Sequence, residues 1–239
     1  MQFDFNPILK AVGPMGAFMK PERTALTRST QAITPESLQR DLLEDTNTQP
    51  HRILWIDGVG GFLLVESDEV IVGQAAPRAK VDVAIVGDLS RQSAAIRRSE
   101  GDYLLQPLQA TQLNGADIDR PHLLSHNDEL QLGDRVKLQF MRPSPLSATA
   151  VLKMGSLNRF KPNVDGVLLL ADSCILGPAA TSHVQCPHWK GELLMFKKGD
   201  DWVFRTLETV TVNGEEAQGQ ILLTPGMRMQ GEDFSLSVE

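Results

Sequence analysis

The sequence predicts an all-β protein that is built from two tandem β-sandwiches. The 239 residues contain many short apolar runs that are separated by Gly-rich or Asn-Gly turns, and almost no segment shows a helical period. A second observation is an internal repeat, in which residues 90–115 recur without a gap as residues 189–214. Short strands with regular turns indicate sandwiches, and the repeat indicates two of them.

The evidence for the repeat is the chemical character of the aligned positions more than the identity of their residues. Asn114-Gly115 aligns with Asn213-Gly214, and both pairs are strong hairpin signals because Asn and Gly tolerate positive φ. Each pair follows a polar start, an apolar strand, a charged turn and a strand with an aromatic residue. We therefore predict an N-terminal segment over 1–50, a first sandwich over 51–143 and a second sandwich over 144–239.

The N-terminal segment mixes apolar, polar, Pro and Gly residues without a clear period, which is typical of a partly disordered tail. Thr34 as N-cap and Pro35 at the first helical position predict a short helix that runs to about Glu44. Before this helix lies a hydroxyl-rich run that begins at Thr24. Its alternative interpretation is a regulatory segment that a kinase phosphorylates, adding charge and acceptor oxygens.

Alternation and turn residues place the strands of the first sandwich. Val136, Leu138 and Phe140 point one way from the run Arg135–Met141, which is the pattern of a half-buried antiparallel strand. The other strands are predicted over 52–57, 62–65, 69–73, 81–86, 94–98 and 103–106.

The second sandwich is predicted to begin with a strand in which Leu146 and Leu152 alternate with polar partners. A long connection over 154–165 follows, and two further strands precede the repeated stretch, at 167–170 and 173–177. The closing strand alternates near the C-terminus, where Phe234, Leu236 and Val238 share one side.

Composition excludes several classes of function. A net charge of −7 argues against a nucleic-acid binder, whose affinity depends on basic surface. No apolar run approaches the roughly 20 residues of a membrane helix, and Lys10 and Pro14 interrupt the apolar start, so a cytoplasmic protein is expected. Nucleophile elbows, P-loops and dinucleotide fingerprints are also missing, so we expect neither an enzyme nor a cofactor.

Two cysteines and two histidines lie close together in the sequence and are the candidate metal ligands: Cys174, His183, Cys186 and His188. Their separations do not form a compact zinc knuckle, and Cys174 lies in an apolar strand. We therefore expect no metal site and interpret Cys174 as a small core residue. A disulfide between the cysteines would require an oxidising compartment.

The order of residues in the first sandwich resembles the forkhead-associated (FHA) family. Gly73 closes one strand, Ser90-Arg91 follows the next, Asn114-Gly115 forms the hairpin, and Asn127–Gly133 precedes the last strand. The resemblance covers about 52–141 and extends more faintly to the second sandwich. It implies a SMAD/FHA-type sandwich of eleven strands, whose loops at one end read phosphothreonine peptides.

The chain departs from the family pattern in the loops that contact phosphate. Gly73-Gln74 stands where the family has Gly-Arg, and the family's Ser-x-x-His is Ser90-Arg91-Gln92-Ser93 here. The loop before Asn114-Gly115 is too short to hold the family's Ser-Thr-Asn-Gly. The resemblance therefore places the phosphopeptide site at Ser90, Arg91 and Gln74, with Arg78 as a replacement for the missing arginine.

The resemblance implies a non-enzymatic interaction or adaptor module in signalling, which reads phosphothreonine peptides through the first sandwich. Its partner would be a protein phosphorylated on Ser or Thr, or a Ser/Thr kinase. The lost residues leave open the alternative of a phospho-independent scaffold or assembly protein that uses degenerate sandwiches. In the second sandwich Lys190 alone lacks the geometry to bind phosphate, and Trp189 is either an exposed anchor for a partner or packs locally.

Overall fold

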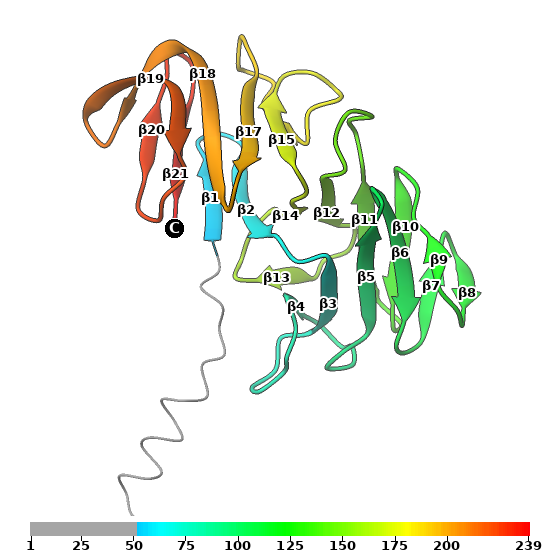
Figure 1. The fold of residues 1–239 in the computed structure, drawn as a ribbon. Helices are drawn as coiled ribbons and strands as arrows, with labels where there is room; N and C mark the ends of the chain where they lie inside the picture. Colours follow the sequence, from blue (N-terminus) through cyan, green and yellow to red (C-terminus); the bar gives the residue numbers. More distant parts are fainter. Residues whose placement is uncertain (1–51) are drawn as a thin grey trace, which may run out of the picture. The chain divides into compact units, whose positions relative to one another are not determined.

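The computed structural model describes residues 52–239 (Figure 1). The predicted tail and its helix over residues 34–44 lie outside the described residues. The secondary structure of the described residues consists of strands, turns and bends, which confirms the predicted all-β fold.

The strands of residues 52–141 follow the predicted order, with β9 and β10 added before the closing strand. Their bounds are β1 Arg52–Ile56, β2 Gly60–Val65, β3 Glu69–Gln74, β4 Val83–Val86, β5 Ala94–Ser99, β6 Asp102–Pro107, β7 Thr111–Leu113, β8 Ala116–Ile118, β9 His122–Leu123, β10 Asp128–Leu132 and β11 Val136–Met141.

The remaining strands include one that the sequence did not indicate, because β13 lies within the predicted long connection. Their bounds are β12 Ala150–Met154, β13 Arg159–Lys161, β14 Gly166–Leu169, β15 Ser173–Gly177, β16 Val184–Gln185, β17 Leu193–Lys198, β18 Asp201–Val212, β19 Glu215–Leu222, β20 Arg228–Gln230 and β21 Ser235–Val238.

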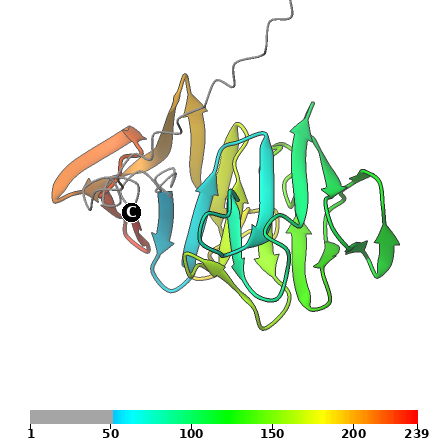
Figure 2. The same cartoon turned by 90° about the horizontal axis from the view of Figure 1, so that it is seen from below.

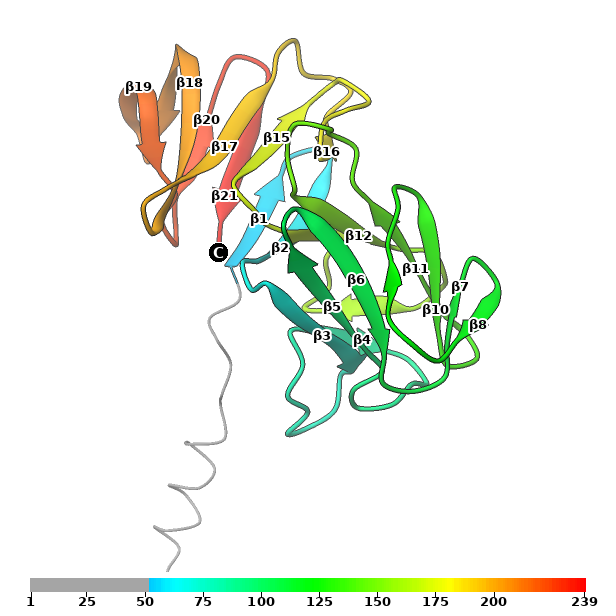
Figure 3. The same cartoon turned by 45° about the vertical axis from the view of Figure 1, so that its right-hand side comes forward.

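The described strands form two sheets. The smaller has the order β13-β4-β3-β5-β6-β9, and the larger runs β16-β15-β17-β18-β20-β21-β1-β2-β14-β12-β11-β10-β7-β8, with β19 paired to β18. In Figures 1 and 3 strands β15, β17 and β18 lie above, β3 to β5 lie below, and β1, β2 and β12 lie between them.

The middle strands of the larger sheet separate two hydrophobic cores. Leu63 and Leu169 pack in the core that also holds Phe140, whereas their neighbours Leu64 and Leu168 pack in the core that holds Trp202 and Phe204. Because successive side chains of a strand point to opposite faces, one strand can serve both cores. All four residues of β14 are accordingly buried.

Strand pairing crosses between the two repeats. The closing strand of the first repeat, β11, pairs with β12, and the closing strand of the second, β21, pairs with β1. Strands β2 and β14 then join the two repeats through a parallel pairing of Phe62–Val65 with Gly166–Leu169. Residues 150–169, which we assigned to the second sandwich, thus provide β12, β13 and β14 around the first core.

The internal repeat is visible strand by strand. Strands β5, β6 and β11 begin at Ala94, Asp102 and Val136, and β17, β18 and β21 begin 99 residues later. Both predicted hairpins form, with φ of 52° at Asn114 and 51° at Asn213. Asn is one of the few residues other than Gly that adopts this left-handed conformation readily.

Candidate functional site

Three loops of the first repeat meet in a pocket of about 460 Å³. They follow β3, β4 and β6, and the loops after β3 and β4 lie at the lower end of the view in Figure 1, so that Figure 2 looks onto this side from below. The lining residues are Arg78, Ala79, Lys80, Arg91, Gln92, Leu108 and Gln109.

Gly73 allows the loop after β4 to lie against β3. A Cβ at this position would overlap the carbonyl oxygen of Arg91 and lie 2.7 Å from its carbonyl carbon. The backbone N–H of Gln74 donates to the Ser90 carbonyl at 3.0 Å, and the N–H of Ser93 donates to the Val72 carbonyl at 2.8 Å. The Arg91 backbone therefore has a definite position beside the end of β3.

Ser93 occupies the position at which the family pattern has histidine, and its side chain is structural. It is 1% exposed, and its hydroxyl donates to the Ser90 carbonyl at 3.1 Å, which closes the turn that presents Arg91. The Ser93 carbonyl accepts hydrogen bonds from the N–H groups of Leu108 and Gln109, both at 3.0 Å. One buried serine thus connects the loops after β4 and β6.

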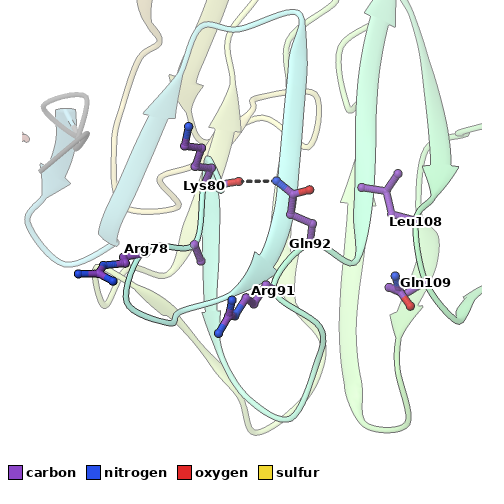
Figure 4. A pocket seen from close by; sticks show the side chains of 7 residues that line it. Arg78, Lys80, Arg91, Gln92, Leu108 and Gln109 are labelled. Atoms are coloured by element: carbon purple, nitrogen blue, oxygen red, sulfur yellow. Dashed lines mark hydrogen bonds between the residues drawn. The ribbon is translucent and has the colours of Figure 1, made fainter. Parts of the chain in front are cut away.

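The pocket is positively charged. Arg78, Lys80 and Arg91 are all exposed, and none of the lining residues in the described part of the chain is acidic. Figure 4 shows the guanidinium groups of Arg78 and Arg91 directed to the same side, while the Lys80 ammonium points away from them. Gln92 is held between the loops, because its side-chain amide donates to the Lys80 carbonyl at 3.0 Å.

Two of the four predicted site residues line this pocket and two do not. Arg78 and Arg91 both line it, and their role in binding a phosphopeptide stays a prediction. Gln74 is half-buried, and its side-chain amide donates to the Gly87 carbonyl at 3.2 Å. Ser90 is exposed at the edge of the turn, where its carbonyl accepts the bonds from Gln74 and Ser93.

Sequence reasoning missed Lys80 and Gln109 as lining residues. Lys80 is separated from the Ser90–Gln92 turn by β4, so only the pairing of β3 with β4 and β5 brings it close. Gln109 could have been found from its place in the shortened loop, where the family has its phosphate-contacting residues. The hairpin Asn114 is fully engaged elsewhere, since it accepts from the Glu129 N–H at 2.9 Å and donates to Asp128 at 2.8 Å.

In the second repeat the basic residue equivalent to Arg91 contacts acids of the turn between β20 and β21. Lys190 stands 99 residues after Arg91; its ammonium group contacts Glu232 and its backbone N–H donates to Asp233. The contact with Glu232 raises the pKa of Lys190. A Cβ at Gly177 would lie 2.8 Å from Cγ of Glu192, so a third carboxylate side chain occupies the place beside this strand end.

Trp189 packs locally. Its side chain is 7% exposed and its ring lies 4.8 Å from that of Phe234, so the alternative of an exposed anchor is wrong. Burial of this large ring contributes to the second core.

The candidate metal ligands of the second repeat are divided between core and surface. Cys174, Cys186 and His183 are buried, both cysteines are free thiols, and His188 is exposed. Within residues 52–239 no three His, Cys, Asp or Glu side chains form a group that could hold a metal ion. Burial raises the pKa of both thiols, that of Cys186 to about 12, which disfavours the reactive thiolate.

The described strands and turns include no candidate for a membrane-spanning helix. Over residues 52–239 no helix is long and apolar enough to cross a bilayer.

A comparison with protein families finds a match over the part of the chain that carries the pocket. The family model of the FHA domain matches residues 70–133, which run from β3 to the turn after β10 and include every residue of the basic pocket. Residues 70–133 therefore belong to an FHA domain, as the resemblance predicted. The FHA-like character of residues 144–239 remains a prediction. No curated protein matches the chain.

Several solved structures are similar to parts of the chain. The FHA-2 domain of an ABC transporter from Mycobacterium tuberculosis has 23% identity over 39% of this chain and 79% of its own, with a TM-score of 0.30. An FHA domain from Chlamydia trachomatis has 25% identity over 35% of this chain and 89% of its own, with a TM-score of 0.27. The N-terminal FHA domain of a component of the bacterial Type VII secretion apparatus has 11% identity over 79% of this chain and 92% of its own, with a TM-score of 0.22.

The class of protein follows from the domain. FHA domains are protein-interaction modules, which generally bind phosphorylated peptides, and are not enzymes.

Proposed function

We propose that this protein is a non-enzymatic adaptor whose FHA domain binds phosphorylated peptides of a partner protein through the basic pocket. The observation that carries the proposal is the pair of guanidinium groups, Arg78 and Arg91, which are directed to the same side of the pocket at the loop end of the matched domain. A phosphate group has a charge of about −1.5 to −2 at pH 7 and three acceptor oxygens. A site with arginine side chains and no carboxylate among its lining residues suits such a ligand.

Arg91 has the central role in this proposal. Its backbone is held by the contacts of Gly73 and Ser93, so its guanidinium begins from a defined point on the pocket rim. Arg78 and Lys80 belong to the loop after β3 and supply further positive charge, and the Gln109 side chain adds polar groups from the third loop. Arginine presents a planar set of donors that matches phosphate oxygens in pairs.

Contrast with the second repeat supports a single binding site. There the cation Lys190 already contacts Glu232, and Asp233 accepts the backbone N–H that an anion would otherwise use. An anionic ligand would meet two carboxylates at this position, so we assign peptide binding to the first repeat alone.

The test is a titration of the full chain with two matched pools of degenerate peptides, which are identical except that the central threonine is phosphorylated in one. We expect binding of the phosphorylated pool only, detected by fluorescence anisotropy. Arg91→Ala should weaken it about 10- to 100-fold, because charge-assisted hydrogen bonds contribute about 1.5–3 kcal/mol each. Lys190→Ala is the matched control and should leave the affinity unchanged.

Two results would contradict the proposal: equal affinity for both pools, or an Arg91→Ala protein that binds like the wild type. Equal affinity would favour the second candidate function, a phospho-independent scaffold. The observation behind this candidate is that strands of each repeat complete the sheet of the other, which joins residues 52–239 into a continuous assembly. A protein phosphorylated on Ser or Thr, or a Ser/Thr kinase, is the partner that the first candidate requires.

A further inference from the structure

The second repeat has a sheet face that belongs to neither hydrophobic core. Strands β15, β17, β18 and β19 pair in this order and lie side by side in Figure 1. Residues such as Met195 and Phe204 point from these strands into the second core. Successive side chains of a strand point to opposite faces, so the alternate residues point away from that core. Five of them are apolar and lie outside both cores of residues 52–239: Ile175, Leu194, Phe196, Val203 and Leu222.

The strand register makes these five side chains one continuous surface, which we call the outer apolar face. Phe196 pairs with Val203, and Val203 pairs with Leu222, so three strands place their side chains in one row. Leu194 pairs with Ile175 and forms the next row with it. Side chains directly opposite each other on one face of a sheet are in contact. Leu222 ends the first row and is 48% exposed.

The equivalent face of the first repeat has an ion pair in place of part of this surface. Arg97 stands 99 residues before Phe196, and its guanidinium donates to Glu69 at 2.9 Å. Ser173 takes the place of Glu69, because Ser173 pairs with Phe196 as Glu69 pairs with Arg97. An exposed ion pair is thus replaced by an aromatic ring and a small side chain. A continuous apolar patch on a protein surface marks an interaction site.

The charges around the outer apolar face complement those of a second, inverted copy of the same face. Lys198 continues the alternation of β17 at one end of the face, and Glu192 precedes this strand at the other end. On the neighbouring β18 the signs are reversed. Asp201 pairs with Lys198, and Arg205 pairs with Leu194, next to Glu192. All four charged residues are exposed. A copy that lies with its β17 over β18 therefore places a cation over an anion at both ends.

We propose that the outer apolar face is the docking surface for a second copy of this chain. The two copies are related by a two-fold axis along the strands, so that β17 of each lies over β18 of the other. Phe196 packs against Val203 of the second copy, and Lys198 meets its Asp201. Packed sheets lie about 10 Å apart, with strand directions within about 30° of each other. In such a two-fold interface every contact occurs twice.

One existing contact changes when the copies meet. In the single chain the Lys198 ammonium donates to the Gln220 side chain at 2.7 Å. This hydrogen bond is exposed, so its net contribution to stability is small. The ion pair with Asp201 of the second copy replaces it. The proposal does not depend on peptide binding, because the basic pocket lies in the first repeat.

The first experiment is sedimentation velocity of the full chain over a range of concentrations, where we expect a monomer–dimer equilibrium. Phe196→Arg should raise the dissociation constant of the dimer roughly 30-fold or more, because each dimer loses the ring at two places in its centre. Leu123→Arg is the matched control. Leu123 is 63% exposed and stands 99 residues before Leu222, on the first repeat, so its substitution should leave the dimer unchanged.

The second experiment tests the two-fold arrangement by exchanging charges. Lys198→Asp and Asp201→Lys should each weaken dimerisation about tenfold or more, because each variant alone places like charges opposite each other at both equivalent contacts. An equimolar mixture of the two variants should recover the wild-type affinity. In the mixed dimer the two substituted side chains meet each other, and the two original side chains meet at the other contact. Recovery also shows that both variants are folded.

Each contrary outcome overturns the proposal. A wild-type chain that remains monomeric at every concentration shows that the face does not bind a second copy. A dimer that survives Phe196→Arg, or that Leu123→Arg abolishes, places the contact on another surface. If the two charge variants dimerise weakly alone and no better when mixed, β17 does not lie over β18 of the second copy.

Discussion

Gly73 and Ser93 hold the Ser90–Gln92 turn against β3, although neither residue lines the basic pocket. Gly73 acts by having no side chain, and Ser93 acts through a hydroxyl that is too buried to meet a ligand. The position of the Arg91 guanidinium therefore depends on residues that contribute no charge.

Gly73→Ala should destabilise the protein by about 1–3 kcal/mol, since overpacking against a backbone carbonyl forces the backbone to shift. It should also weaken phosphopeptide binding, because the turn that carries Arg91 must move. Gly191→Ala is the control: a Cβ there meets no atom within 4 Å. Urea unfolding and peptide titration measure both effects, and equal stability of the two variants would contradict the argument.

His183 makes stability depend on pH. Its ring is 2% exposed, and the N–H of Ile175 donates to its Nδ1 at 2.9 Å, so the neutral ring fits the site. Burial lowers the pKa of His183 to about 4, against 6.5 for the ordinary side chain, and outweighs the backbone contacts that would raise it. Between these two values the unfolded chain binds the proton more readily, so stability falls as the pH falls from 6.5 towards 4.

The measurement compares wild type with His183→Gln, whose side chain does not titrate. Between pH 7 and pH 5 the wild-type free energy of unfolding should fall by about 2 kcal/mol more than that of the variant. His188→Gln, at an exposed position, should follow the wild type. Identical pH dependence of wild type and His183→Gln would disprove the role of this ring.

At the scale of elements, β14 shows how one strand serves two cores. Leu168 is 0% exposed in the core of the second repeat, and its neighbour Leu169 is 1% exposed in the core of the first. A strand on the outside of a sandwich would have one of these side chains in water.

Leu168→Ala and Leu169→Ala should each lower the free energy of unfolding by about 2–5 kcal/mol, because both substitutions leave a cavity. The exposed Leu157→Ala is the control and should be within about 0.5 kcal/mol of wild type. Chemical denaturation of the three variants measures these differences. A β14 variant with the stability of the wild type would show that one face of the strand is not enclosed.

At the scale of the molecule, the crossed pairing makes the two repeats depend on each other. A cut after Pro143 leaves β11 without its neighbour β12 and leaves β21 without β1. Exposed strand edges and half-covered cores favour aggregation over folding.

We therefore expect fragments 1–143 and 144–239 to be unfolded or aggregated separately and to form a folded complex when they are co-expressed. The intact chain should unfold in one transition. The measurement is the dispersion of amide signals in NMR spectra of each fragment and of the pair. A well-dispersed spectrum from either fragment alone would refute the interdependence.

Much of the local structure was predictable. Alternating residues such as Val136, Leu138 and Phe140 decide which face of a strand is buried, and Asn114-Gly115 decides where a hairpin turns. Both signals depend on neighbours in the sequence, so they can be recognised without knowledge of the fold. β13 was missed because a strand of three residues in a polar connection has no such signal.

The candidate site was only partly predictable. Arg91 lies in the Ser-Arg pattern of the resemblance and Arg78 was proposed to replace the missing arginine, and their role in binding stays a prediction. The place of Lys80 in the pocket depends on how β3, β4 and β5 pair. The structural role of Ser93 was also hidden, since a serine in place of histidine looks like a loss until its hydrogen bond to Ser90 is seen.

By itself, the sequence determined an all-β chain with an internal repeat, its turns, and an FHA domain over residues 70–133. Only the tertiary structure decided that β12 completes the first repeat and β1 the second, and that Arg78, Lys80 and Arg91 share a pocket while Lys190 faces acids. The physical reason is that strand formation depends on neighbouring residues, whereas the choice of a pairing partner depends on which distant apolar faces can be buried together.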